Sequence, residues 1–169
     1  DGDYPAACEP EDIKEQDGRL VIENLKLYAE DVYDPVDVNM LAVGDTIKAD
    51  GFDYIVEDIS RDPDGTVNIN GGYADGGVTL VTSENANGYF FMGYDDASAY
   101  TQIATVTLPI STRLTFEDGT DPVKDPITVS YPDLVAAIAA MEDPDFCAHN
   151  TTITVTNGEI TAIKCTYIP

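Results

Sequence analysis

The chain of 169 residues contains no tryptophan, a single histidine and only eight basic residues. With His149 as its one histidine, the chain cannot build a metal site from several imidazoles of its own. The absence of tryptophan removes the usual platform on which sugar rings stack, so tyrosine would have to replace it. The longest apolar run, Leu134 to Met141, has eight residues, whereas a membrane-spanning helix needs about 20. We therefore expect no membrane insertion.

The scarcity of basic residues leaves a strong negative charge, with 32 acidic residues and a formal net charge of -24. Such a surface repels phosphate backbones and anionic lipid headgroups. Nucleic acids and anionic membrane surfaces are therefore not expected as partners. Three explanations of the acidity stay open at this point: solubility outside the cell, binding of cations, and adaptation to high salt.

The three cysteines, Cys8, Cys147 and Cys165, form no C-x-x-C pair, which excludes a zinc ribbon and a thioredoxin-like motif. Cys147 and Cys165 flank a predicted hairpin, so we predict a disulfide between them; a pair of reduced, half-buried thiols is the alternative. Cys8 would then be left over. Catalysis by Cys147 with His149 is not expected, because the thiol follows a predicted helix C-terminus, where the helix dipole opposes a thiolate.

Alternating apolar residues and Gly-containing turns predict a mainly β protein. Asp50-Gly51 is a favoured pair for a two-residue hairpin turn, and this register places Ala49 opposite Phe52. Asn157-Gly158 predicts a second hairpin of the same kind. Residues 104–110 alternate apolar and polar side chains, as in a half-buried strand.

These patterns predict an α+β chain, mainly β, that begins with a flexible acidic arm at residues 1–18. Residues 19–116 are predicted to form an antiparallel β domain, a small barrel or sandwich of short strands. Residues 117–169 are predicted to form a C-terminal β-β-α-β-β subdomain with one helix that starts at Pro132. The two predicted parts could also form one continuous domain.

Oxygen-bearing side chains gather near one predicted turn, at Asp62, Asp64 and Asn68. Calcium prefers six to eight converging oxygen ligands, so these residues are a candidate metal site. The pattern of an EF-hand loop is absent. The alternative is plain turn chemistry, because Asp, Asn and Gly are the residues that form turns.

The densest aromatic group of the chain lies at residues 89–94. Tyr89 and Phe91 would point to one side of a strand and Phe90 to the other. Tyr89, Phe91 and Tyr94 are therefore candidates for an exposed ligand-binding face. The alternative is that this side belongs to the core.

No catalytic constellation or cofactor motif emerges, so whether the chain is an enzyme is left uncertain, with a non-enzymatic role favoured. Its acidic N-terminal segment and threonine-rich hairpins resemble secreted bacterial proteins, which implies an extracellular or cell-surface location. We predict a non-catalytic binding or adhesion module for an extracellular protein or glycan. The alternatives are an extracellular hydrolase that uses carboxylates on glycan or peptide, and a structural component of a surface assembly.

Overall fold

The computed structural model describes residues 1–49, 52–83, 86–92, 100–141 and 144–167, with the side chains of residues 83, 86–87 and 90–92 left aside. The chain forms two compact units. Unit 1 consists of Asp1–Ala29 and Gln102–Pro169, and unit 2 is Glu30–Thr101, inserted between them. The protein is mainly β, as predicted, with several antiparallel sheets and a short helix near the C-terminus. Within the described ranges no helix has the length and hydrophobicity needed to span a bilayer.

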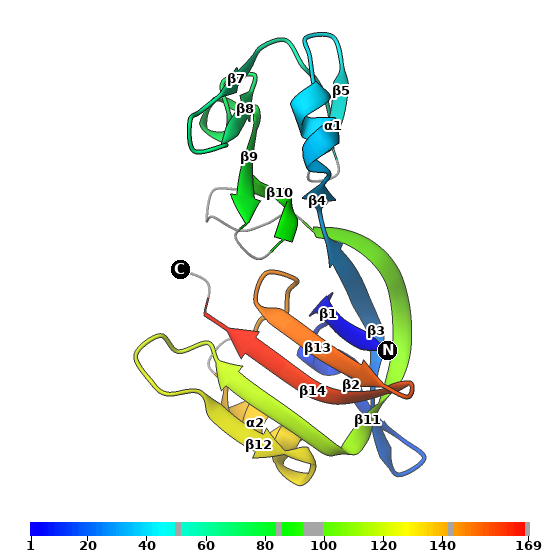
Figure 1. Cartoon of the computed structure of the whole chain (residues 1–169). Coiled ribbons are helices and arrows are strands. Elements are labelled where there is room, and N and C mark those ends of the chain that lie inside the picture. The colour runs from blue at the N-terminus through cyan, green and yellow to red at the C-terminus, as the bar shows by residue number, and fades with distance from the viewer. Residues whose placement is uncertain (50–51, 84–85, 93–99, 142–143, 168–169) are drawn as a thin grey trace. The chain divides into compact units, whose positions relative to one another are not determined.

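Unit 1 is built on a sheet that closes on itself. Its strands are β1 (Gly2–Ala7), β2 (Ile13–Gln16), β3 (Arg19–Glu30), β11 (Tyr100–Gly119), β12 (Ile127–Ser130), β13 (Thr151–Thr156) and β14 (Glu159–Thr166). They lie in the order β12-β11-β14-β13-β1-β3-β2, and β11 also pairs with β3 (Figure 1). Strands β1, β3, β11, β14 and β13 therefore form a five-stranded ring, to which β2 and β12 are added at the sides.

Along the chain, helix α2 (Leu134–Ala140) comes between the ring strands β11 and β13, and it directly follows the 3-10 turn η3 (Tyr131–Asp133). Its residues Leu134 and Ile138 are buried one helical turn apart. Within the ring, β1 is antiparallel to β3 and β13, and β13 is antiparallel to β14, whereas β11 runs parallel to β14. The five ring strands therefore form a small β-barrel that is closed by the pairing of β11 with β3. Connectivity alone assigns no function.

The interior of unit 1 is apolar because its strands alternate buried and exposed residues. Its buried cluster includes Ile22, Leu25, Ile110, Leu114, Phe116, Ile153, Ile160 and Ile163. Alternation in β3 changes phase at Asn24, where φ is 50°, so Ile22 and Leu25 both face inward although they are three residues apart. The break in alternation at Asn24, visible in the sequence, thus marks a real irregularity of the strand.

Arg19 contacts two other strands of the ring. From β3, its Nε donates a hydrogen bond to the carbonyl oxygen of Ile110 in β11 at 3.4 Å. Its Nη2 lies 2.5 Å from a carboxylate oxygen of Glu159 at the start of β14. One side chain therefore connects three strands of the barrel.

Unit 2 contains a five-stranded sheet, a hairpin and a short helix. Its elements are β4 (Val32–Tyr33), α1 (Pro35–Met40), β5 (Thr46–Ala49), β6 (Phe52–Ile55), β7 (Ile59–Arg61), β8 (Val67–Ile69), η2 (Tyr73–Asp75), β9 (Val78–Ser83) and β10 (Ala86–Met92). The sheet has the order β4-β10-β9-β8-β7, and β5 pairs with β6. Unit 2 has its own buried core, which includes Val38, Ile47, Val56, Ile69, Val78 and Leu80.

Both predicted two-residue hairpins have the expected register. Ala49 pairs with Phe52 in the β5–β6 hairpin, whose turn residues 50–51 lie outside the described residues. Thr156 pairs with Glu159 in the β13–β14 hairpin. Asn157 and Gly158 between them have φ values of 52° and 76°, as a type I′ turn requires.

The structure divides the chain differently from the predicted boundaries at residues 18 and 116. Residues 1–18 were expected to be a flexible arm, but they form β1, the 3-10 turn η1 (Pro10–Asp12) and β2. Strand β1 is held because Gly2 pairs with Val155 and Ala6 pairs with Leu27. Partners so distant in sequence leave no local signal.

The backbone of neighbouring residues fills the space that a side chain at position 77 would need. A Cβ there would overlap the carbonyl oxygen of Ile69 and lie 2.7 Å from that of Asn70. We predict that Gly77→Ala lowers the free energy of unfolding by about 3 kcal/mol or more, because the backbone of unit 2 must move. The control is Gly76→Ala, where φ is 80° and the Cβ meets nothing within 4 Å, so only about 1–2 kcal/mol of backbone strain is expected. Urea unfolding of the full chain measures both, and equal losses would contradict the prediction.

Candidate functional site

The predicted calcium ligands lie together at the turn between β7 and β8. The Asp64 carboxylate accepts a hydrogen bond from the Thr66 backbone N–H at 2.9 Å, which lowers the pKa of Asp64. The Asn68 amide donates to the Asp62 carboxylate at 3.3 Å and accepts from the Thr79 hydroxyl at 2.8 Å. Within the described ranges no cluster of three or more candidate metal ligands occurs. The turn uses these groups for its own hydrogen bonds, and calcium binding there stays a prediction.

Of the three residues predicted to form an aromatic binding face, the structure describes the side chain of Tyr89 alone. Tyr89 is 8% exposed and belongs to the core of unit 2. It therefore cannot belong to an exposed binding face, because its strand turns this side chain toward the interior. Phe91 lies in β10, but its side chain, like the whole of Tyr94, is outside the described residues.

The three cysteines gather at one end of unit 1. Cys8 donates its backbone N–H to the carbonyl oxygen of Phe146 at 3.1 Å, and Thr151 donates to that of Cys147 at 2.9 Å. Thr151 also pairs with Cys165, with its hydroxyl oxygen 3.7 Å from the Cys165 sulfur. All three thiols are free in the structure, in contrast with the predicted disulfide. The fully buried Cys165 points from β14 into the core toward Thr151.

Burial makes two of these thiols poor nucleophiles. Desolvation raises the pKa of Cys8 from 9.0 to about 12, and that of Cys165 to about 11. Reactive thiols have lowered pKa values instead. The neighbouring cavity, lined by Cys8, Ile13 and Ile138 among others, measures about 10 Å³, enough for one water molecule at most. Cys8 and Cys165 therefore behave as buried core residues.

These pKa values predict a loss of stability at alkaline pH. A thiol whose pKa is raised by folding contributes stability that is complete below its unfolded pKa of 9.0 and is lost as the pH rises through its folded value. We expect the urea midpoint to fall between about pH 9 and pH 11. The double variant Cys8→Ser/Cys165→Ser should show a shallower fall, whereas Cys147→Ser should follow the original protein. Parallel curves for all three would contradict the assignment.

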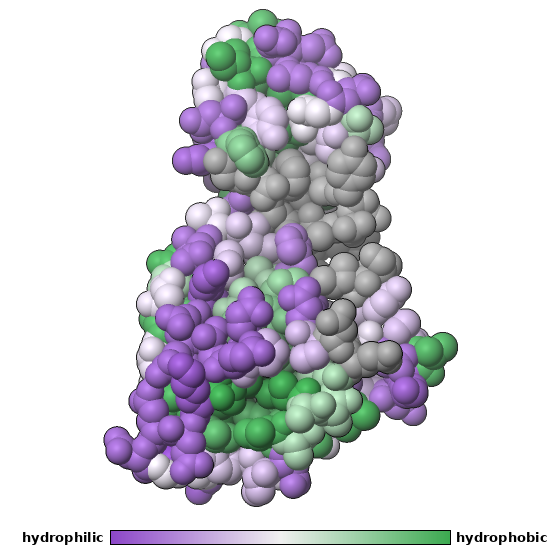
Figure 2. Space-filling model, turned by 180° about the vertical axis from the view of Figure 1, so that it is seen from behind, coloured by the Kyte–Doolittle hydropathy of each residue, from purple (hydrophilic) through white to green (hydrophobic). Residues whose placement is uncertain are grey.

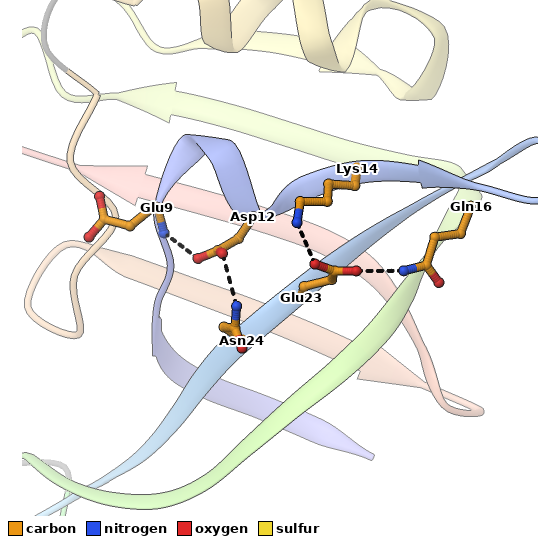
Figure 3. A network of polar contacts seen from close by, with 6 residues as sticks. All are labelled: Glu9, Asp12, Lys14, Gln16, Glu23 and Asn24. Carbon is orange, nitrogen blue, oxygen red and sulfur yellow. Dashed lines mark hydrogen bonds and ion pairs between the residues drawn. The ribbon is translucent and has the colours of Figure 1, made fainter.

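A polar network covers the β2–β3 hairpin (Figure 3). The Glu23 carboxylate accepts hydrogen bonds from the Lys14 ammonium and the Gln16 amide, each at 2.6 Å. The Asp12 carboxylate accepts from the Glu9 backbone N–H at 3.0 Å. It also accepts from the Asn24 amide, at 3.2 Å.

Both carboxylates of this network are held in their ionised form. The hydrogen bond from Lys14 lowers the pKa of Glu23, and the backbone N–H of Glu9 lowers that of Asp12. General acid–base work by a carboxylate pair needs the two pKa values pushed apart, so that one group keeps its proton. Two groups shifted in the same direction on an exposed surface indicate a structural role.

This network predicts a specific sensitivity to acid. A carboxylate whose pKa is lowered by folding contributes stability that is present above its unfolded pKa and is lost as the pH falls through the folded value. For Glu23 the unfolded value is 4.5, so the loss begins below about pH 4.5. Glu23→Gln should therefore flatten the acid side of the melting-temperature profile. The matched control is Glu15→Gln on the same hairpin, and an identical effect of both variants would argue against the network.

Unit 2 exposes several large apolar side chains within a short stretch of sequence. The exposed fractions are 63% for Val36, 74% for Met40, 67% for Val43 and 63% for Ile55. Figure 2 shows green apolar surface beside purple charged surface at the upper end of the view, where unit 2 lies. We call these four residues the apolar patch.

The members of the patch lie on α1, on the loop that follows it and on β6. Val36 and Met40 are one turn apart on α1, so they share a helix face. The loop after α1 folds onto β6, since Gly44 donates its N–H to the carbonyl oxygen of Val56 at 2.8 Å. That bond holds the loop that carries Val43 against the end of β6, which carries Ile55. Figure 1 shows that this loop joins α1 to β5.

The helix that carries the patch is fixed at both ends. The Asp34 carboxylate accepts from the Val36 backbone N–H at 2.8 Å, as an N-cap does. At the other end, the Arg61 guanidinium donates to the carbonyl oxygens of Val38, Asn39 and Leu41 at 2.9, 3.3 and 3.2 Å. These bonds satisfy carbonyls that a helix terminus leaves without partners.

Sequence reasoning did not predict α1 or the patch. The signal was present as Asp34-Pro35, because Asp is favoured at an N-cap and Pro at the first helical position.

Comparison with known proteins adds no relative: no protein-family model, no curated protein and no solved structure matches this chain.

Proposed function

We propose that the protein is a non-catalytic binding or adhesion module of the bacterial exterior or cell envelope. The observation that carries the proposal is the apolar patch, in which Met40 is 74% exposed on a helix held by a cap at each end. Clustered exposed apolar side chains cost solubility and mark interaction sites. A rigid support lowers the entropy that binding would otherwise consume.

The carboxylates support a binding role over hydrolysis. The pKa values of Asp12, Glu23, Asp64 and Asp121 are all lowered by hydrogen bonds. A hydrolase that uses two carboxylates needs one of them to keep its proton.

The hydrolase alternative would need a site with several carboxylates, and one depression of unit 1 has such a lining. An open depression in unit 1 is lined by Asp118, Asp121, Asp125 and Lys124, together with Ile127. Asp118 accepts two hydrogen bonds from Thr120, and Asp121 is paired with Lys124 at 2.9 Å. These contacts hold both aspartates as acceptors, which suits a structural loop.

The proposal predicts binding without turnover. We expect the full chain, applied to an array of glycans and peptides, to be retained saturably and to leave the retained compound intact. The readouts are retention, and new reducing ends or amino groups measured by colorimetric titration. Product release above the buffer rate would contradict the proposal and favour the hydrolase. An Asp118→Asn variant that abolished this release would locate the activity in the depression.

A further inference from the structure

The apolar patch of unit 2 lies in a strongly negative setting. Residues 30–101 contain fifteen acidic and two basic residues. Of the two cations, Arg61 donates to three carbonyl oxygens at the end of α1. Lys48 lies on β5, where its register partner is Asp53. The patch therefore faces a partner across a surface dominated by carboxylates.

Several carboxylates lie next to members of the patch. Asp37 follows Val36 on α1 and is exposed. Asp53 precedes Ile55 by two residues on β6, so the two side chains point to the same side of the strand. Glu57 follows Ile55 by two residues and is also exposed. A partner can therefore make apolar contacts with the patch and ion pairs with the carboxylates next to it.

This combination defines the partner by its chemistry. We propose that the patch docks a cationic amphipathic segment, which lays an apolar face on Val36, Met40, Val43 and Ile55 and places Lys or Arg beside the surrounding carboxylates. The inference rests on the proposed binding function and names the class of partner. A flexible, exposed methionine such as Met40 suits a surface that accepts varied apolar side chains.

A second copy of the chain does not fit this description. Each copy has a net charge of -24, so two such patches would repel each other at moderate salt. An anionic membrane surface meets the same repulsion. A positively charged segment is attracted instead, and its apolar side chains gain from leaving water.

The test measures binding of a fluorescent helical peptide of about 18 residues made of Leu and Lys, long enough to form a helix on the surface. Two control peptides are a scrambled Leu/Lys sequence without an apolar face and a Leu/Glu counterpart. We expect anisotropy titrations to show saturable binding of the amphipathic Leu/Lys peptide. Binding should weaken as salt rises, because surface charges are screened.

Variants of the full chain locate the site. Met40→Ser/Val43→Ser should weaken binding at least about tenfold, since central apolar anchors dominate most interfaces. Both side chains are mostly exposed, so the fold should persist, which circular dichroism checks. The matched control is Val123→Ser, an exposed position of unit 1, which should leave affinity unchanged. Asp37→Asn/Glu57→Gln should weaken binding and reduce its salt dependence.

Several results would overturn the inference. Equal binding of the amphipathic and scrambled peptides, or equal losses in the patch and control variants, would mean attraction by charge alone. Preference for the Leu/Glu peptide would reverse the expected electrostatics. Absence of peptide binding by a protein that retains glycans or peptides on the array would overturn the inference and leave the proposed function in place.

Discussion

The closure of the sheet in unit 1 is the constraint on which the structure depends. Strand β11 pairs with β3, β12 and β14, so this strand alone turns an open sheet into a ring. Closure gives every ring strand a partner on both sides, so that the remaining edges belong to the short strands β2 and β12. It also encloses the apolar side chains from five strands, with Phe116 at 1% exposure among the largest. Hydrophobic burial of this kind supplies most of the free energy that opposes chain entropy.

Local features of the fold were predictable from the sequence, whereas long-range features were not. The register of both hairpins follows from Asp50-Gly51 and Asn157-Gly158, because a two-residue turn fixes which residues face each other. Pairing of Gly2 with Val155 depends on which distant strands complete the barrel. Pro109 lies inside β11, directly before Ile110, which pairs with Ile160 of β14, and no local pattern predicts this pairing of distant residues.

The candidate sites show the same division. Asp62, Asp64 and Asn68 were correctly placed near one turn, because turn chemistry is local. The burial of Tyr89 depends on the elements packed against its strand, which the alternation pattern cannot reveal. The apolar patch needs α1, the loop after it and β6 in their folded arrangement before its side chains become neighbours.

The insertion of unit 2 sets an order for synthesis on the ribosome. Residues 30–101 are contiguous, so unit 2 has all its strands soon after residue 101 emerges. The barrel must wait for β13 and β14, at residues 151–166, because β1 pairs with β3 early in synthesis but meets its second partner, β13, only there. Domains generally fold as they emerge, N-terminal parts first. Here the inserted segment can complete its fold before the segment that surrounds it, and one edge of β1 stays unpaired until β13 has been made.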